Sequence, residues 1–199
     1  MKSITIDRSK RLKDDPGKGH NRWHPDVPPV LEVDPGEEVL LETRDASDCQ
    51  VQWDTTLADL AGFAASAGHP LTGPVFVKGA ELGDLLEIEY VDILPEAMGW
   101  TRMRPGSGFL PDLFPDPFLV RWALKDGWAR SPELPGVRIP EACFMGTAGM
   151  APSRAQLEQW TKREADLAAR GGFALPPSPT DAVPADGPVA YEGLRTIPR

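Results

Sequence analysis

The three histidines of the chain are the residues whose chemistry first needs an explanation. His20 and His24 lie four positions apart, and the carboxylate of Asp26 follows two residues later. Imidazole and carboxylate groups are ligands that a borderline-soft divalent metal takes in proteins. On a helix this spacing would place both rings on one face, but the three prolines within residues 25–29 oppose a helix. The residues alone leave two interpretations open, a metal site and hydrogen-bonded structural histidines.

A polar segment, residues 42–50, follows directly on a predicted strand. It contains the carboxylate of Asp45, the thiol of Cys49 and the amide of Gln50. Such groups at a strand end are well placed to meet a small polar substrate, and the alternative is an ordinary Asp/Ser turn. His69, the third histidine, has the same two interpretations, a functional and a structural one.

A second cysteine lies beside a carboxylate. Cys143 follows Glu141 by two positions, so Glu141 could activate the thiol as the nucleophile of a hydrolase. The neighbouring Phe144 and Met145 favour the alternative, in which Cys143 is a small buried hydrophobe.

The elements that position these side chains are predicted to be short strands. The chain has 22 prolines and 19 glycines among 199 residues, spread between short apolar runs, which is typical of many short strands joined by tight turns. The sequence therefore predicts a mainly β fold with few helices, α+β at most, arranged as a β-sandwich or pseudo-barrel. The apolar patterns predict strands at residues 30–33, 39–41, 73–77 and 85–91. Asp34-Pro35-Gly36-Glu37 predicts a type II turn between the first two. Residues 99–140 show little periodicity and are predicted to form long loops and short strands.

One helix is predicted near residues 153–170. Ser153 and Gln156 have the spacing of a capping box, and Gly171 and Gly172 end the pattern. Residues 1–172 are predicted to form one β domain. Residues 173–199 are rich in proline, so we predict a tail without helix or central strand that is ordered by contact with another chain.

Composition and charge narrow the function classes. The net charge is −9, from 30 acidic and 21 basic side chains, which argues against nucleic acid as a partner. No apolar run is long enough to cross a membrane, and the N-terminus lacks the apolar region of a secretory signal. Two cysteines do not make a disulfide framework, so we expect a cytoplasmic protein. The seven basic side chains within residues 1–24 could meet an acidic partner or be solvated charges beside a first strand.

Several motifs in one collinear order carry a family resemblance that covers nearly the whole chain. Taken together, they resemble the acetamidase/formamidase family. They are His20-Asn21-Arg22-Trp23-His24-Pro25-Asp26, Val33-Asp34-Pro35-Gly36, Glu42-Thr43-Arg44-Asp45-Ala46, His69-Pro70-Leu71-Thr72-Gly73-Pro74, Val77-Lys78-Gly79-Ala80-Glu81-Leu82-Gly83-Asp84, Pro105-Gly106-Ser107-Gly108-Phe109-Leu110, Leu134-Pro135-Gly136-Val137-Arg138-Ile139-Pro140, Phe144-Met145-Gly146 and Gly193-Leu194-Arg195-Thr196-Ile197-Pro198.

The resemblance implies hydrolysis of a short amide, such as formamide or acetamide, to ammonia and a carboxylate. It also implies a mainly β fold, an oligomeric assembly and a bound divalent metal, for which we expect zinc. Such chemistry needs a water made nucleophilic by a metal or a base, and donors for the oxyanion. On this basis the expected catalytic residues are Asp45, Gln50 and Glu141, and the expected metal ligands are His20, His24 and His69.

The chain departs from the family pattern in three places. Asp48-Cys49-Gln50 stands where the family has Asp-Gly-Gln or Gly-Gly-Gln, which puts a side chain where the backbone needs the freedom of glycine. Glu141-Ala142-Cys143 replaces a Gly-Ala-Pro-like turn. Family members are also much longer, so we expect a second polypeptide to supply the C-terminal half of the fold. The alternative is a non-catalytic binding or regulatory module derived from a truncated amidase.

Overall fold

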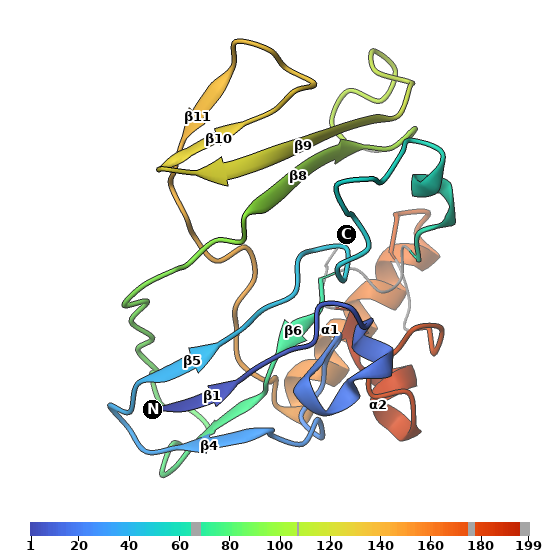
Figure 1. The fold of residues 1–199 in the computed structure, drawn as a ribbon. Coiled ribbons are helices and arrows are strands. Elements are labelled where there is room, and N and C mark those ends of the chain that lie inside the picture. Colours follow the sequence, from blue (N-terminus) through green and yellow to red (C-terminus); the bar gives the residue numbers. More distant parts are fainter. Residues whose placement is uncertain (65–68, 107, 175–177, 196–199) are drawn as a thin grey trace. The chain divides into compact units, whose positions relative to one another are not determined.

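The computed structural model describes residues 1–64, 69–106, 108–174 and 178–195 (Figure 1). The chain divides into two compact units. Unit 1 comprises Met1–Gln50, Ala64–Glu87 and Thr147–Arg199, and unit 2 comprises Val51–Phe63 and Ile88–Gly146. The described residues contain many short strands and few helices, which confirms the predicted mainly β fold class.

The described residues of unit 1 form four two-stranded pairs. Two pairs are parallel and two are antiparallel, and each strand has two or three residues. The parallel pairs are β1 (Lys2–Ile4) with β5 (Val39–Leu41) and β4 (Leu31–Val33) with β7 (Val75–Val77); the antiparallel pairs are β2 (Gly19–His20) with β6 (Leu71–Thr72) and β3 (Arg22–Trp23) with β12 (Leu194–Arg195).

Two glycines show why these pairs form as they do. The predicted turn between β4 and β5 is present, with Gly36 at φ +80° and the Glu37 amide donating to the Asp34 carbonyl at 3.1 Å. The β2–β6 pair needs Gly19, because a Cβ there would lie 2.2 Å from the Leu71 carbonyl oxygen. A glycine therefore brings the strand that carries His20 close to β6.

Unit 2 contains a four-stranded antiparallel sheet in the order β11-β10-β9-β8. Asp126 and Gly127, at φ +53° and +73°, form the two-residue turn between β9 and β10, as expected of an Asp-Gly hairpin. Val51, Leu60 and Leu119 form a small core. The strands are β8 (Met98–Met103), β9 (Phe118–Lys125), β10 (Trp128–Arg130) and β11 (Arg138–Pro140).

One strand prediction was wrong. Residues 85–91 form no strand; Leu85 is 97% exposed and Ile88 54% exposed, and nothing in the described part of the chain pairs with this segment. An alternating pattern gives a strand only where a partner edge is available. Residues 99–140, predicted to form long loops and short strands, contain most of the largest sheet, in which Phe118–Ala123 of β9 pair with β8 and Ala123–Lys125 pair with β10.

The predicted helix is confirmed as α1 (Arg154–Ala169). Its capping box is complete: the Gln156 amide donates to Ser153 Oγ at 3.2 Å, and the Ser153 amide donates to Gln156 Oε1 at 3.0 Å. Short 3₁₀ helices cover Leu12–Asp14, Pro16–Lys18 and Asp59–Gly62. No helix in the described residues is long and apolar enough to cross a membrane.

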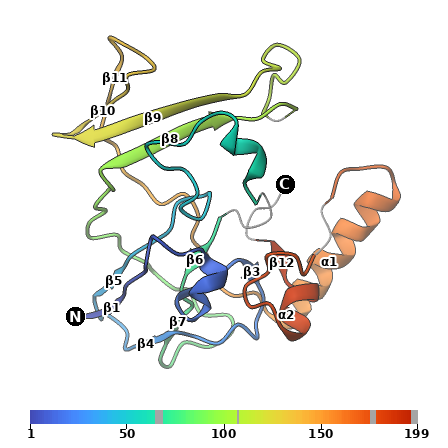
Figure 2. The same ribbon diagram turned by 45° about the vertical axis from the view of Figure 1, so that its right-hand side comes forward.

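The prediction that residues 173–199 form no helix was wrong, whereas their strand is not a central one. They contain α2 (Gly187–Glu192) and β12, which pairs with β3 of the same chain (Figure 2). Asn21 holds this segment through three hydrogen bonds, to the carbonyls of Asp181 and Val183 and from the Val183 amide. The calls for residues 175–177 and 196–199 lie outside the described residues. The division into a domain of residues 1–172 and a tail stays a prediction.

An ion pair inside the unit 2 sheet predicts a pH-dependent stability. Arg121 Nε donates to Glu133 Oε1 at 2.8 Å, and Ser131 Oγ donates to Glu133 Oε2 at 2.5 Å. The Ser131 hydroxyl and the Arg121 guanidinium lower the pKa of Glu133 to about 2. A lowered folded-state pKa adds stability above the unfolded-state value of about 4.5, and this is lost as the pH falls toward 2.

We therefore expect Glu133→Gln to flatten the fall in unfolding free energy between about pH 4.5 and 2. Urea unfolding at a series of pH values measures this, and Glu158→Gln on the exposed surface of α1 is the control. Identical pH profiles for wild type and Glu133→Gln would contradict the assignment.

Candidate functional site

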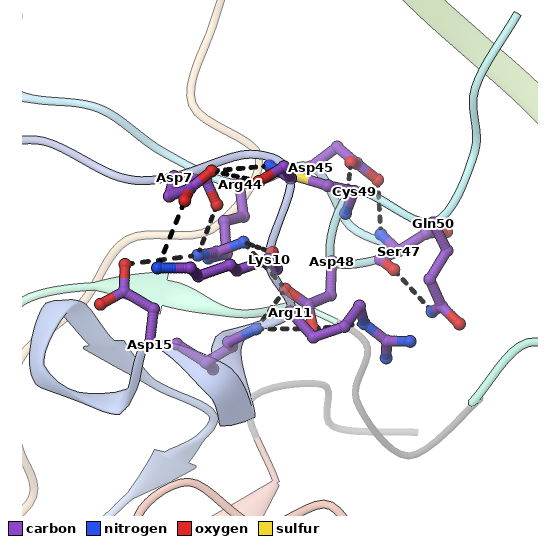
Figure 3. A network of polar contacts seen from close by, with 12 residues as sticks. Asp7, Lys10, Arg11, Asp15, Arg44, Asp45, Ser47, Asp48, Cys49 and Gln50 are labelled. Carbon is purple, nitrogen blue, oxygen red and sulfur yellow. Dashed lines mark hydrogen bonds and ion pairs between the residues drawn. The ribbon is translucent and has the colours of Figure 1, made fainter.

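The polar loop after β5 is shaped by the carboxylate of Asp45. Its Oδ1 accepts from the Ser47 amide at 2.7 Å and its Oδ2 from the Cys49 amide at 2.8 Å (Figure 3). These bonds hold a turn in which Asp48 and Cys49 both have φ +58°. Asp45 therefore organises the loop backbone with both carboxylate oxygens.

The carboxylate of Asp48 anchors this loop to the N-terminal arm. It accepts from the Leu12 amide at 2.9 and 3.0 Å and from Arg11 Nε at 2.8 Å, and Arg44 Nη1 lies 3.5 Å away. The Asp48 and Arg44 side chains are both buried. Figure 3 shows these side chains converging beneath the loop. Arg11 is thus a structural partner of the loop and not a solvated charge of the basic arm.

His69 and Gln50 lie against the same loop. The His69 amide donates to the Ala46 carbonyl at 3.0 Å, and burial lowers the pKa of the His69 imidazole. Gln50 Nε2 donates to the Ser47 carbonyl at 2.6 Å, and its Oε1 accepts from the Ala64 amide at 2.9 Å. The amide of Gln50 therefore serves to hold the loop.

Backbone strain is concentrated in this region. Asp48 and Cys49 at φ +58° and His69 at φ +57° are three of the five described non-glycine residues with positive φ. For such residues this conformation costs about 1–2 kcal/mol, and it persists where the surrounding structure imposes it, commonly at functional sites. Two segments that the sequence predicted to be functional are thus brought together.

The strain at residue 49 gives a testable prediction. We expect Cys49→Gly to raise the free energy of unfolding by about 0.5–1 kcal/mol. Glycine adopts positive φ without a Cβ clash, and this gain exceeds the larger backbone entropy that glycine loses on folding. Chemical denaturation measures the change. Cys49→Ala, which keeps the Cβ, is the matched control. Equal stabilities of the glycine and alanine variants would show that the backbone here is unstrained.

His20 in β2 is oriented for chemistry at one nitrogen. Its Nδ1 lies 2.7 Å from the Arg22 carbonyl oxygen, so Nδ1 carries the proton and Nε2 keeps its lone pair. Burial lowers the pKa of His20, although the bond to Arg22 opposes this, and the imidazole is thereby favoured in its neutral form. The Trp23 ring packs edge-on against it at 6.2 Å between centroids.

His24 is arranged differently. Its Nδ1 accepts from the Asp26 amide at 3.0 Å, so the proton lies on Nε2, which is 3.6 Å from Glu192 Oε2. Neither nitrogen has a free lone pair in this tautomer. The side chain is completely enclosed, and the arrangement favours a hydrogen-bond donor over a metal ligand.

Glu141 and Cys143 lie in unit 2, whereas the other five predicted site residues belong to unit 1. Cys143 Sγ is 3.5 Å from Glu141 Oε1. Partial desolvation by neighbouring atoms and the Glu141 carboxylate raise the pKa of the Cys143 thiol, so the pair does not make the thiolate that a nucleophile requires. The alternative interpretation, a buried Cys143, was wrong, because the side chain is exposed.

The residues fit a metal only in part. His20 presents a lone pair in the orientation that metal-binding histidines adopt. No group of three or more His, Cys, Asp or Glu side chains in the part of the chain that the structure describes could hold a metal ion. A complete zinc site is thus not assembled by these residues.

Sequence reasoning missed the buried charges that support the site. Arg22, Arg44 and Asp48 are all at most 8% exposed. Arg22 Nη1 donates to the Asn21 carbonyl at 3.0 Å, and its Nη2 donates to the Ser178 carbonyl. Burial and the Arg195 charge lower the pKa of Arg22, whereas the Asp181 carboxylate raises it by a smaller amount. The signals in the sequence were that Arg22 and Arg44 lie inside the motifs that contain His20 and Asp45, and that Asp48 lies in the polar segment of residues 42–50.

Comparisons with known proteins agree with this architecture. The model of the acetamidase/formamidase family matches residues 5–199. The chain is 34% identical to an acetamidase of Mycolicibacterium smegmatis over 98% of its own length and 54% of that protein. It is 33% identical to a formamidase of Methylophilus methylotrophus, over 100% and 53%. It thus spans about half the length of the curated relatives it matches.

Solved structures give the same result. A gamma lactamase from Delftia acidovorans superposes with a TM-score of 0.85 at 33% identity, over 100% of this chain and 53% of that one. An acetamidase from Bacillus halodurans superposes with a TM-score of 0.56 at 26% identity, over 62% of this chain and 40% of that one.

Proposed function

Because this chain belongs to the acetamidase/formamidase family, we propose that it takes part in hydrolysing a short-chain amide, of the formamide or acetamide type, to ammonia and a carboxylate. The observation that carries the proposal is the orientation of His20 within a chain that matches amidases along its whole length. The Nδ1 bond to the Arg22 carbonyl leaves Nε2 able to accept a proton.

The chemistry needs a base to take a proton from the attacking water. We assign this role to Nε2 of His20, a neutral imidazole whose ring Arg22 and Trp23 fix in place. Asp45 and Gln50 are positioning residues, because their polar atoms hold the loop backbone of residues 45–50. His69 is adjacent to this loop through Ala46 and remains a candidate for contact with substrate.

A divalent metal, zinc by the family resemblance, remains part of the proposal. His20 supports it, since its Nε2 is the nitrogen a metal would take. That lone pair either takes a proton or holds the metal, so a metal-bound His20 would leave the base role to another group. The described residues supply no three-ligand group, so further ligands would come from outside them. A bound metal would polarise the amide carbonyl or acidify a water.

We also propose that the active assembly includes a second polypeptide, equivalent to the half of the relatives that this chain does not match. Unit 2 supports this, because its small core is accompanied by many exposed large apolar side chains, which are typical of an interaction surface. Examples are Val91, Leu94, Phe109, Leu113 and Phe144, all more than 60% exposed. A reducing compartment, the cytoplasm, suits the two free cysteines.

Ammonia release from formamide and acetamide tests the proposal. The chain is assayed alone and after co-expression with a polypeptide from the same genome that matches the uncovered half of the relatives. We expect ammonia only from the co-purified pair. Activity of the chain alone would overturn the requirement for a second polypeptide. A pair that forms but releases no ammonia would overturn the catalytic role and favour a non-catalytic binding module.

A further inference from the structure

The short ladder between β3 and β12 places two arginines opposite each other. Arg22 and Arg195 are register partners in this antiparallel pair, and directly opposed residues share one face of a sheet. His24 follows Arg22 by two positions and lies directly after the end of β3. Figure 2 shows β12 beside β3, with α2 immediately before β12.

Three nitrogen donors in or directly after this ladder have no hydrogen-bond partner. They are Arg22 Nε, Arg195 Nε and His24 Nε2, and they make up half of the six buried side-chain polar atoms without a partner in the described residues. An unpaired buried donor costs about 1–3 kcal/mol, and such groups are normally satisfied. The two arginine donors on opposed residues, with His24 next to them in the chain, indicate a missing acceptor.

The charges around the face favour an anion. Asp181 acts on Arg22, but within the described ranges Arg195 forms no ion pair. The carboxylate of Glu192 approaches His24, with its Oε2 3.6 Å from His24 Nε2 and 3.7 Å from Arg154 Nη1. Both separations exceed a hydrogen bond, and the Glu192 side chain is 56% exposed. Glu192 thus approaches His24 without forming a hydrogen bond to it.

We propose that the β3–β12 face binds the carboxylate group of a short-chain carboxylic acid, with Arg195, Arg22 and His24 as donors. Guanidinium groups recognise carboxylates through paired, charge-assisted hydrogen bonds, which fits an anion shared between two arginines. Glu192 competes with the ligand for His24 and moves aside when the ligand enters. The identification of the ligand as acetate or formate rests on the proposed function, because these are the products of acetamide and formamide hydrolysis.

Isothermal titration of the whole chain with sodium acetate, at ionic strength held constant with sodium chloride, tests the site. We expect binding of acetate and none of acetamide. Arg195→Met should weaken acetate binding about tenfold. The Arg195 side chain makes no hydrogen bond within the described residues, so this variant should keep its fold, as circular dichroism would verify. Arg163→Met, an exposed arginine on α1, is the matched control and should bind acetate as wild type does.

A second variant should change the acetate affinity in the opposite direction. Glu192→Gln removes the competing carboxylate and should tighten acetate binding by about two- to fivefold, a gain that misfolding cannot produce. Absence of acetate binding by wild type, or unchanged affinity in Arg195→Met, would overturn the site. Acetate binding together with an inactive two-chain assembly would overturn the proposed function and support the site. Amide hydrolysis without acetate binding would overturn the site alone.

Discussion

Replacing His20 with alanine is expected to lower amide hydrolysis by the two-chain assembly by at least a hundredfold. Loss of a positioned general base typically removes about 10²–10⁴ of the rate, and alanine leaves nothing at the position of Nε2. The fold should survive, because the His20 side chain gives up a single hydrogen bond, to the Arg22 carbonyl, worth about 1 kcal/mol. Ammonia release and thermal unfolding on the same preparation measure both effects.

Variants at the other histidines make this prediction specific. We expect His69→Ala to reduce activity and metal content as His20→Ala does. His20→Gln places a neutral side chain of similar size at this position. If His20 is a base, this variant should be as stable as wild type but inactive. If His20 is only structural, the variant should keep both its stability and its activity. Wild-type activity and metal content in both His20→Ala and His69→Ala would show that the site lies elsewhere in the chain.

Local patterns in the sequence predicted local structure well. The capping box of Ser153 and Gln156 and the turn at Gly36 depend on neighbours within four residues, and both are present. The glycine-to-cysteine departure from the family pattern was also informative, since Cys49 has the positive φ that glycine would adopt easily. These features need no knowledge of distant contacts.

Features that depend on distant partners were not predictable. The alternating segment at residues 85–91 has no partner strand in the described part of the chain, and the tail pairs with β3 more than 170 residues away. His69 meets the Asp45 loop through a backbone bond to Ala46, which no spacing in the sequence indicates. The burial of charged residues was not predictable either. Nothing in the sequence distinguishes Arg44 from a surface arginine, and only the fold places Asp48 beside it.

Replacing Asp48 with alanine is expected to destabilise the chain by about 3–5 kcal/mol. Asp48 is 1% exposed, and its carboxylate faces the buried guanidinium of Arg44 while also accepting from Arg11 Nε and the Leu12 amide. Removing one member of a buried pair leaves the other charge uncompensated, which costs far more than an exposed pair is worth. Urea unfolding measures the loss, with the exposed Asp116→Ala as control.

A double-mutant cycle separates this network from a simple loss of side-chain volume. Arg11 is about a quarter exposed, so Arg11→Met alone should cost less than Asp48→Ala. If the 2.8 Å contact between Arg11 Nε and Asp48 is part of the network, the two changes together should cost less than their sum by about 0.5–3 kcal/mol. Additive effects would mean that Asp48 acts through Arg44 and the Leu12 amide alone. Because the same loop carries Asp45 and lies against His69, coupling would show that the basic N-terminal arm holds the candidate site in place.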